Sequence, residues 1–381
     1  MNQEIEEKLK INTLAGQYVV QLLAALINDE PVPQLPCYLT WQQVYETAKM
    51  HSVDSMVFCA AKEQILSQPE LYEVWNHKRR FNLIQSMTQI REHDRIIEAL
   101  NAEGIRTLPV KGCIMKSLYP QADWRQMCDL DILIDEGNME HASEIMQELG
   151  YDLHDCSEKD ISFSCLPYML VELHYKLFEK KRAVFAAYYE HIWELALSNQ
   201  NGSNCFSLKP EDEYIYHLAH FNKHYSEVCG TGIRSIMDVA MFFRRYGGEW
   251  DTAYINGELN KLNLLPVADC AQKLAEHWFG TKEQCEEDLS QPEQDMARIV
   301  FCSGTYGNIL SRIVRDVGQK NASEFGKAKF AMKRAFLPIS YMKHDYPVLD
   351  KWPVFYPCCF VHRLIRHRKQ MAFELKMIFD K

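Results

Sequence analysis

The chain has 381 residues, a length that predicts about two to three domains. Apolar residues make up 47% and charged residues 25%, which excludes a disordered, collagen-like or coiled-coil protein. The 52 acidic and 42 basic residues give a formal net charge of −10. Whole-surface binding to duplex nucleic acid is therefore not expected, whereas a local basic site for a nucleotide is compatible with this charge.

The 13 cysteines are scattered and none follow a Cys-X-X-Cys spacing, so neither a zinc ribbon nor a disulfide scaffold is predicted. The scattered cysteines are expected to be reduced thiols, which favours a cytoplasmic location. Residues Met1–Glu4 are polar and acidic, unlike the start of a signal peptide. We expect charged residues to divide every apolar run into stretches shorter than about 18 residues, so no membrane span is predicted.

The first hundred residues predict helices. Apolar positions recur with helical spacing over Leu9–Ile27, and the polar, proline-containing stretch Asn28–Pro33 ends that helix. Thr40 with Gln43 is the signature of a new helix start, and a longer helix is predicted from near Leu71 to Asn101.

The pattern changes at Ile105, where short apolar or alternating runs predict strands at 105–110, 128–135, 161–165 and 169–175, with helices at 113–118 and 138–149. Helices return from about Ala183, with one beginning at Lys209–Pro210 and another over 233–246. The predicted fold is α+β. Its domains are an N-terminal helical region (1–103), an α/β core (104–180) and a C-terminal helical domain (181–381).

Two carboxylates define the most informative stretch. Asp129 and Asp131 are two positions apart in a predicted strand and therefore lie on one face, opposite Leu130 and Ile132. Adjacent carboxylates repel each other unless a cation lies between them, and oxygen ligands on a rigid strand suit Mg²⁺. If the strand that contains Glu172 lies beside this one, Glu172 completes a three-carboxylate cluster able to hold two metal ions.

These residues resemble the DNA-polymerase-β-like nucleotidyltransferase superfamily, and most closely its branch of uncharacterised bacterial nucleotidyltransferases. The resemblance rests on Lys111-Gly112, Arg125, Asp129-Leu-Asp131 and Glu172-Leu-His174. It extends through most of 105–366, with further likeness at His217-Leu-Ala-His220, Gly232-Ile-Arg234 with Asp238, and a tail from Tyr346 to Arg363. It implies a small α/β core with a mixed sheet flanked by helical regions, a nucleoside triphosphate substrate, and Mg²⁺ or Mn²⁺ bound by Asp129, Asp131 and Glu172.

The neighbours of the carboxylates are candidate nucleotide-binding residues. Gly112 begins a predicted helix whose free N–H groups and dipole suit a triphosphate, and Lys111 adds a cation. Cys113 stands where the superfamily usually has glycine or serine, so phosphate contact there is expected to rest on backbone N–H groups. Cys113 itself is expected to be a small residue that the turn tolerates, and a reactive thiol at this helix start is the alternative. Arg125 either contacts phosphate or holds Asp129 or Asp131 by an ion pair.

A third group of candidates is expected around an acceptor or phosphate pocket. His217, His220 and His224 share one helical face, which either packs on the core, lines the pocket or binds a separate metal ion. Arg234 either pairs with Asp238 or lies near the nucleotide. His174 and Lys176 share the face of Glu172 and are expected to flank the metal site.

The function predicted from the sequence is Mg²⁺-dependent transfer of NMP from an NTP to an acceptor hydroxyl, with release of pyrophosphate. The acceptor is a small molecule, a saccharide, a protein or an RNA end. One alternative is a non-catalytic nucleotide-binding or regulatory protein on a degenerate transferase fold. Another is a metal hydrolase that uses the histidine-rich helix.

Overall fold

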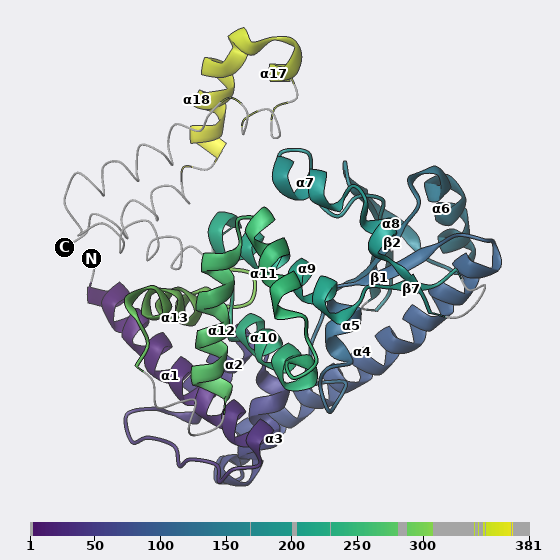
Figure 1. Ribbon diagram of the computed structural model, residues 1–381. Coiled ribbons are helices and arrows are strands. Elements are labelled where there is room, and N and C mark those ends of the chain that lie inside the picture. Colours follow the sequence, from purple (N-terminus) through teal and green to yellow (C-terminus); the bar gives the residue numbers. More distant parts are fainter. Residues whose placement is uncertain are drawn as a thin grey trace.

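The computed structural model describes residues 3–167, 169–199, 204–228, 230–280 and 288–307, together with 339, 342, 346, 348–366 and 368. Helices lie on both sides of a five-stranded sheet in the chain order, as predicted (Figure 1). The helical segments before and after the sheet pack against each other. One hydrophobic cluster contains buried residues of both, for example Leu22 and Leu23 with Ala271 and Phe279.

Four helices precede the sheet: α1 (Gln3–Asn28), α2 (Trp41–Met50), α3 (Asp54–Ile65) and α4 (Pro69–Ala102). The predicted start of α2 is confirmed. The side chain of Thr40 accepts a hydrogen bond from the Gln43 N–H at 3.3 Å, and Gln43 Oε1 accepts one from the Thr40 N–H at 2.8 Å. This reciprocal capping satisfies two N–H groups that a helix end otherwise leaves free.

Helix α1 corrects the argument against a membrane span. Residues 11–28 carry no charged side chain, and the segment Glu7–Asn28 is long and apolar enough to cross a membrane by length and composition alone. Its apolar side chains are used inside the protein, because Val19, Leu22 and Leu23 are fully buried in the core. That packing is the ordinary reason for an apolar helix in a folded domain.

Helix α4 joins the helical part of the molecule to the sheet (Figure 1). Trp75 near its beginning lies in the helical core, whereas Leu100 near its end lies in the core beneath the sheet. Its middle is buried but polar. Gln89 Nε2 donates to the Met127 carbonyl at 3.0 Å, and Ser86 Oγ accepts from Lys116 Nζ at 2.8 Å. The helix therefore fixes the segment that leads into Asp129.

The sheet has the strand order β1-β2-β5-β4-β3, built from β1 (Thr107–Val110), β2 (Leu130–Ile134), β3 (Asp152–Cys156), β4 (Asp160–Cys165) and β5 (Met169–His174). It is a mixed sheet, since β2 and β5 are parallel and the other neighbours are antiparallel. The predicted strand pair β4–β5 is confirmed. The edge strand β3 was not predicted, because all its residues are exposed and its sequence is mostly polar.

Short helices follow the strands: α5 (Gly112–Lys116) after β1, and η1 (Glu136–Asn138) with α6 (Met139–Glu148) after β2. Leu130, Ile132 and Ile134 point into one core with Met146 of α6 and the end of α4. The opposite face of β2 turns toward the C-terminal helices, where Leu133 joins the larger cluster.

The C-terminal region contains α7 (Ala183–Tyr189), α8 (Ile192–Leu195), a small hairpin of β6 (Leu197–Ser198) and β7 (Phe206–Ser207), α9 (Pro210–Asn222), the π-helical turn η2 (Lys223–Val228), α10 (Ile233–Tyr246), α11 (Thr252–Lys261), α12 (Leu265–Phe279) and α13 (Gln291–Ser303), then α17 (Val348–Lys351), η4 (Pro353–Phe355) and α18 (Tyr356–Arg366). The hairpin was not predicted. It lies beside β1, where the Thr107 N–H donates to the Asn204 carbonyl at 2.8 Å.

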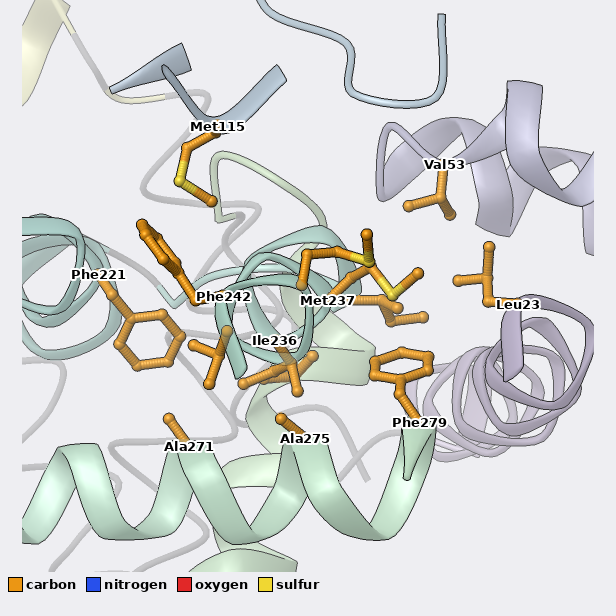
Figure 2. Packing of buried hydrophobic residues seen from close by; sticks show 14 of the residues in the cluster. Leu23, Val53, Met115, Phe221, Ile236, Met237, Phe242, Ala271, Ala275 and Phe279 are labelled. Carbon is orange, nitrogen blue, oxygen red and sulfur yellow. The ribbon is translucent and has the colours of Figure 1, made fainter. Parts of the chain in front are cut away.

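Helix α10 is the centre of the larger core. Figure 2 shows Ile236 of α10 packed over Ala275 of α12, whereas Phe242 points toward Met115. Met237 lies on the side of α10 that faces Leu23 and Val53. Because α10 is held this closely, the polar side chains on its outer face have fixed positions relative to the sheet.

Candidate active site

Strand register brings two of the three predicted carboxylates together. Asp131 and Glu172 are direct partners in the parallel β2–β5 pair, so their side chains lie side by side on one face of the sheet. Asp129 immediately precedes β2. Carboxylate and imidazole atoms of Asp131, Glu172 and His174 lie within 4.8 Å of one another, a spacing that can hold a metal ion.

Asp131 is already neutralised by its neighbours. Its carboxylate forms an ion pair with the Lys111 ammonium, and it accepts a hydrogen bond from His174 Nε2 at 2.7 Å. Burial alone would raise the pKa of Asp131, but Lys111 and His174 together hold it well below its ordinary value. Lys111, which was expected to supply a cation for the triphosphate, therefore serves as the counter-ion of a carboxylate in this structure.

Asp129 bears the repulsion that was expected for the pair. Burial and then the nearby charge of Asp131 raise the pKa of Asp129 to about 6. Among the described residues no cation forms an ion pair with its carboxylate, although Lys111 partly opposes the shift. A cation placed between the two aspartates would lower this repulsion.

A second layer of charge surrounds His174. Its Nδ1 atom lies 3.5 Å from Asp160 Oδ2, and Lys159 forms an ion pair with Asp160 and lies 3.8 Å from Glu172 Oε2. His174 itself is only 1% exposed. It therefore connects the carboxylate of β2 to those of β4 and β5 and fixes the orientation of Asp131.

The turn between β1 and α5 has an unusual backbone. Lys111 adopts φ 58° and ψ −120°, a conformation that a residue with a side chain rarely takes and that costs about 1–3 kcal/mol. A Cβ on Gly112 would lie 3.1 Å from Met127 Cβ and Sδ, so glycine allows the turn to pack against the segment before β2. The turn places the Lys111 side chain over Asp131.

The predicted helix after Gly112 is short. Because α5 spans five residues, its dipole is small and would contribute little to the binding of a phosphate. Cys113 packs against the core beneath the sheet, and burial followed by the charge of Asp131 raises its pKa to about 12. This environment disfavours the charged thiolate form of Cys113 and favours its interpretation as a small residue packed in the turn.

Arg125 contacts a different carboxylate from those expected. Its Nε donates to Asp238 Oδ1 at 2.8 Å, and Tyr119 also donates to that oxygen at 2.7 Å. Arg125 thus pairs with neither Asp129 nor Asp131 among the contacts described. Among the described contacts, no ion pair joins Asp238 to Arg234, whose Nη1 donates to the Gln126 carbonyl at 2.8 Å.

The three histidines occupy the wall opposite the sheet. His220 and His224 face each other with 3.3 Å between their Nε2 atoms, although η2 interrupts the regular helix between them. His217 packs against the ring of Phe242. Burial is the main cause that lowers the pKa of all three, to about 4 for His224, so the rings are neutral at physiological pH.

A cavity of about 320 Å³ separates the sheet from this wall. It is lined by the predicted residues Lys111, Gly112, Arg125, Asp129, Asp131, Glu172, His217, His220, His224, Arg234 and Asp238. Lys176 is not among the lining residues. It extends to the surface and pairs with Glu136 at 3.2 Å, because β5 ends at His174 and its alternation does not continue.

Most of the residues that line the cavity lie in a region that matches a known protein family. Residues 39–280, well over half of the chain, match the family model described as uncharacterised nucleotidyltransferase. The chain belongs to this nucleotidyltransferase family. No curated protein and no solved structure matches the chain. The matched region contains both walls of the cavity up to Phe242 but ends before Thr305 and Tyr306, which also line it.

The cavity of this nucleotidyltransferase contains residues that the sequence did not single out: Lys159, Glu213, Tyr216, Lys223 and Tyr306. The sequence did carry a signal for Glu213, which lies four positions before His217 and so on the same helical face. Burial, and to a smaller degree Asp212, raises the pKa of Glu213 to about 8. No local pattern indicated Tyr306, which approaches the cavity from a distant part of the chain.

Proposed function

We propose that the protein transfers NMP from a nucleoside triphosphate to an acceptor hydroxyl in a reaction that depends on a divalent metal ion, Mg²⁺ or Mn²⁺. The observation that carries the proposal is the parallel pairing of Asp131 with Glu172, with Asp129 beside them, at the wall of a cavity lined by several cations. Family membership supports nucleotidyl transfer as the reaction class.

The residues present fit a divalent cation. Asp129, Asp131 and Glu172 offer the oxygen ligands that Mg²⁺ and Mn²⁺ favour. Asp131 holds the ammonium of Lys111, which shows that this position accommodates positive charge. Lys111 relieves only part of the repulsion between Asp129 and Asp131, and a bound cation would reduce it further. His174 donates to Asp131, so we assign it to orienting the Asp131 carboxylate rather than to binding the metal ion itself.

A metal ion held there would neutralise phosphate charge and make the phosphorus more open to attack. The residues of the chain then position the reactants. Lys111, released from Asp131, lies with Lys159 and Arg234 on the cavity wall, where these cations can hold the triphosphate. Glu172 accepts the proton of the acceptor hydroxyl while the hydroxyl oxygen bonds to the α-phosphorus. The bond between the α-phosphorus and the departing pyrophosphate breaks.

The test combines ligand binding with chemistry. Wild type, Asp131→Asn, Glu172→Gln and the matched control Asp152→Asn on the exposed strand β3 are incubated with each of the four NTPs and Mg²⁺ or Mn²⁺, with cell extract as a source of acceptor. Wild type and the control should release pyrophosphate and form an NMP-modified product detected by mass spectrometry. Both active-site variants should not. Equal release by all four proteins would overturn the proposal.

A non-catalytic nucleotide-binding protein is the second candidate. The observation that favours it is the occupation of Asp131 by Lys111 and His174, which competes with a metal ion. This candidate predicts that nucleotides raise the melting temperature of the wild type while no pyrophosphate is released with any acceptor source. The same incubation, followed by thermal melts, separates the two candidates.

A further inference from the structure

The segment that follows α13 lines the cavity through Thr305 and Tyr306 and is hydrogen-bonded to the end of α2. The Thr305 N–H donates to the Met50 carbonyl at 2.9 Å, and Thr305 Oγ1 donates to Ser52 Oγ at 3.0 Å. Both partners lie at the end of α2, more than 200 positions earlier in the chain. The backbone that carries Tyr306 is therefore attached to the helical core.

Glycine makes this attachment possible. Gly304 has φ 65°, and a Cβ there would lie 2.6 Å from Met50 Cγ and 2.8 Å from the Met50 carbonyl oxygen. On the other side, a Cβ on Gly232 would lie 2.9 Å from the Gly304 carbonyl carbon. Three segments thus meet without room for side chains, and this close packing determines where Tyr306 lies.

Tyr306 presents an open aromatic ring to the cavity. It is 56% exposed, whereas the other aromatic residues among the described cavity lining, Tyr216, Phe221 and Phe242, are at most 3% exposed. Two contacts orient the ring. Its hydroxyl lies 2.6 Å from Cys128 Sγ, next to Asp129, and the Arg234 guanidinium lies 6.0 Å from the ring centroid.

We propose that Tyr306 is the platform on which the nucleobase of the triphosphate stacks. This side of the cavity would then bind the base rather than the phosphates. The proposal rests on the proposed function. An exposed ring beside a guanidinium, held by backbone that cannot shift freely, is the arrangement that binds a base through its π-face. The neighbouring Asp129 and Arg234 place it within the reach of a nucleotide whose phosphates lie at the carboxylates.

Stacking predicts that Tyr306 affects nucleotides but not phosphates alone. Calorimetry in Mg²⁺ compares α,β-methylene analogues of the four NTPs with inorganic tripolyphosphate, which has the phosphates but no base. Tyr306→Leu should weaken each analogue about ten-fold, as expected for loss of one aromatic stack, and leave tripolyphosphate binding unchanged. Tyr306→Phe, which keeps the ring, should bind the analogues almost as wild type does.

The matched control is Tyr38→Leu, since Tyr38 is 62% exposed and lies outside this cavity. Equal weakening of analogues and tripolyphosphate by Tyr306→Leu would overturn the platform in favour of a structural role for the segment. Unchanged nucleotide affinity with a higher KM for the acceptor would assign the ring to the acceptor instead. A wild type that binds neither ligand would overturn the proposed function itself, and the platform with it.

Discussion

The two walls of the cavity carry charge in opposite ways. The sheet wall, made of Asp129, Asp131, Lys159 and Glu172, holds ionised groups in close pairs that strand register imposes. The helical wall, made of His217, His220, His224 and Arg234, holds imidazoles that burial keeps neutral. A sheet fixes where neighbouring side chains stand, whereas a helix face packed on a core mainly removes water from them.

This difference separates the tasks that each wall can perform. Closely spaced carboxylates concentrate negative charge and can hold a metal ion, but they repel phosphate without one. Neutral histidines can donate or accept hydrogen bonds and bring no fixed charge that would compete for the metal. Arg234 adds a permanent positive charge to the helical wall, and its guanidinium lies 6.0 Å from the ring centroid of Tyr306.

The largest expected effect compares one residue from each wall. Asp131→Asn should lower kcat/KM for NMP transfer by about 10³-fold or more, because a metal ligand is worth several kcal/mol in phosphoryl chemistry. His220→Gln, which removes no charge from a neutral ring, should lower it less than about ten-fold. Initial rates of product formation measure both. Similar losses for the two variants would contradict the division between the walls.

The buried ion pair beneath the helical wall should dominate stability. Arg125 and Asp238 have side chains only 9% and 2% exposed and lie 2.8 Å apart. Arg125→Met leaves the Asp238 charge buried without its partner and should lower the free energy of unfolding by about 3–5 kcal/mol in urea titrations. Adding Asp238→Leu should recover part of the loss. Additive losses in the double variant would show that the pair is not coupled.

The two aspartates of the sheet wall should respond in opposite directions without metal. Asp131→Asn removes the charged partner of Lys111 and should destabilise the protein by about 1.5–3 kcal/mol. If repulsion between the two aspartates were the only interaction, Asp131→Asn would stabilise the protein. The expected loss of stability comes from the Lys111 contact, and it is independent of whether Asp131 binds a metal ion during catalysis.

Asp129→Asn should keep or raise the melting temperature at pH 7–8. The folded protein retains a proton on Asp129 between the ordinary pKa of 3.8 and about 6, so wild-type stability falls as the pH rises through this range. Melting scans from pH 4 to 8 measure the difference. A variant that loses stability at pH 8 would show that Asp129 has an attractive partner.

The last expected effect concerns Glu213 on the helical wall. Its raised pKa means that the folded protein holds a proton there between about 4.5 and 8, so stability falls as the pH increases through that window. Glu213→Gln should melt like wild type near pH 5 and above it at pH 9. Glu148→Gln, at an exposed position of α6, is the control. Parallel melting curves for wild type and Glu213→Gln would contradict the burial of this charge.

The sequence by itself determined the local parts of the site. Alternation in Asp129-Leu-Asp131 sends the acids to one face and Leu130 and Ile132 to the core, which is a property of any strand. The same reasoning predicted β4, β5 and the long helix α4. It missed β3 and the β6–β7 hairpin, whose short, polar or exposed sequences lack a periodic apolar signal.

Only the tertiary structure decided which charges meet. Arg125 finds Asp238 at a separation of 113 positions, and Tyr306 reaches Cys128 across 178. Periodicity records the face on which a side chain lies, but any buried arginine is satisfied by whichever carboxylate packing brings within reach. The partner of each charge, and the aromatic ring at the cavity mouth, therefore depended on how α4, α10 and the segment after α13 pack around the sheet.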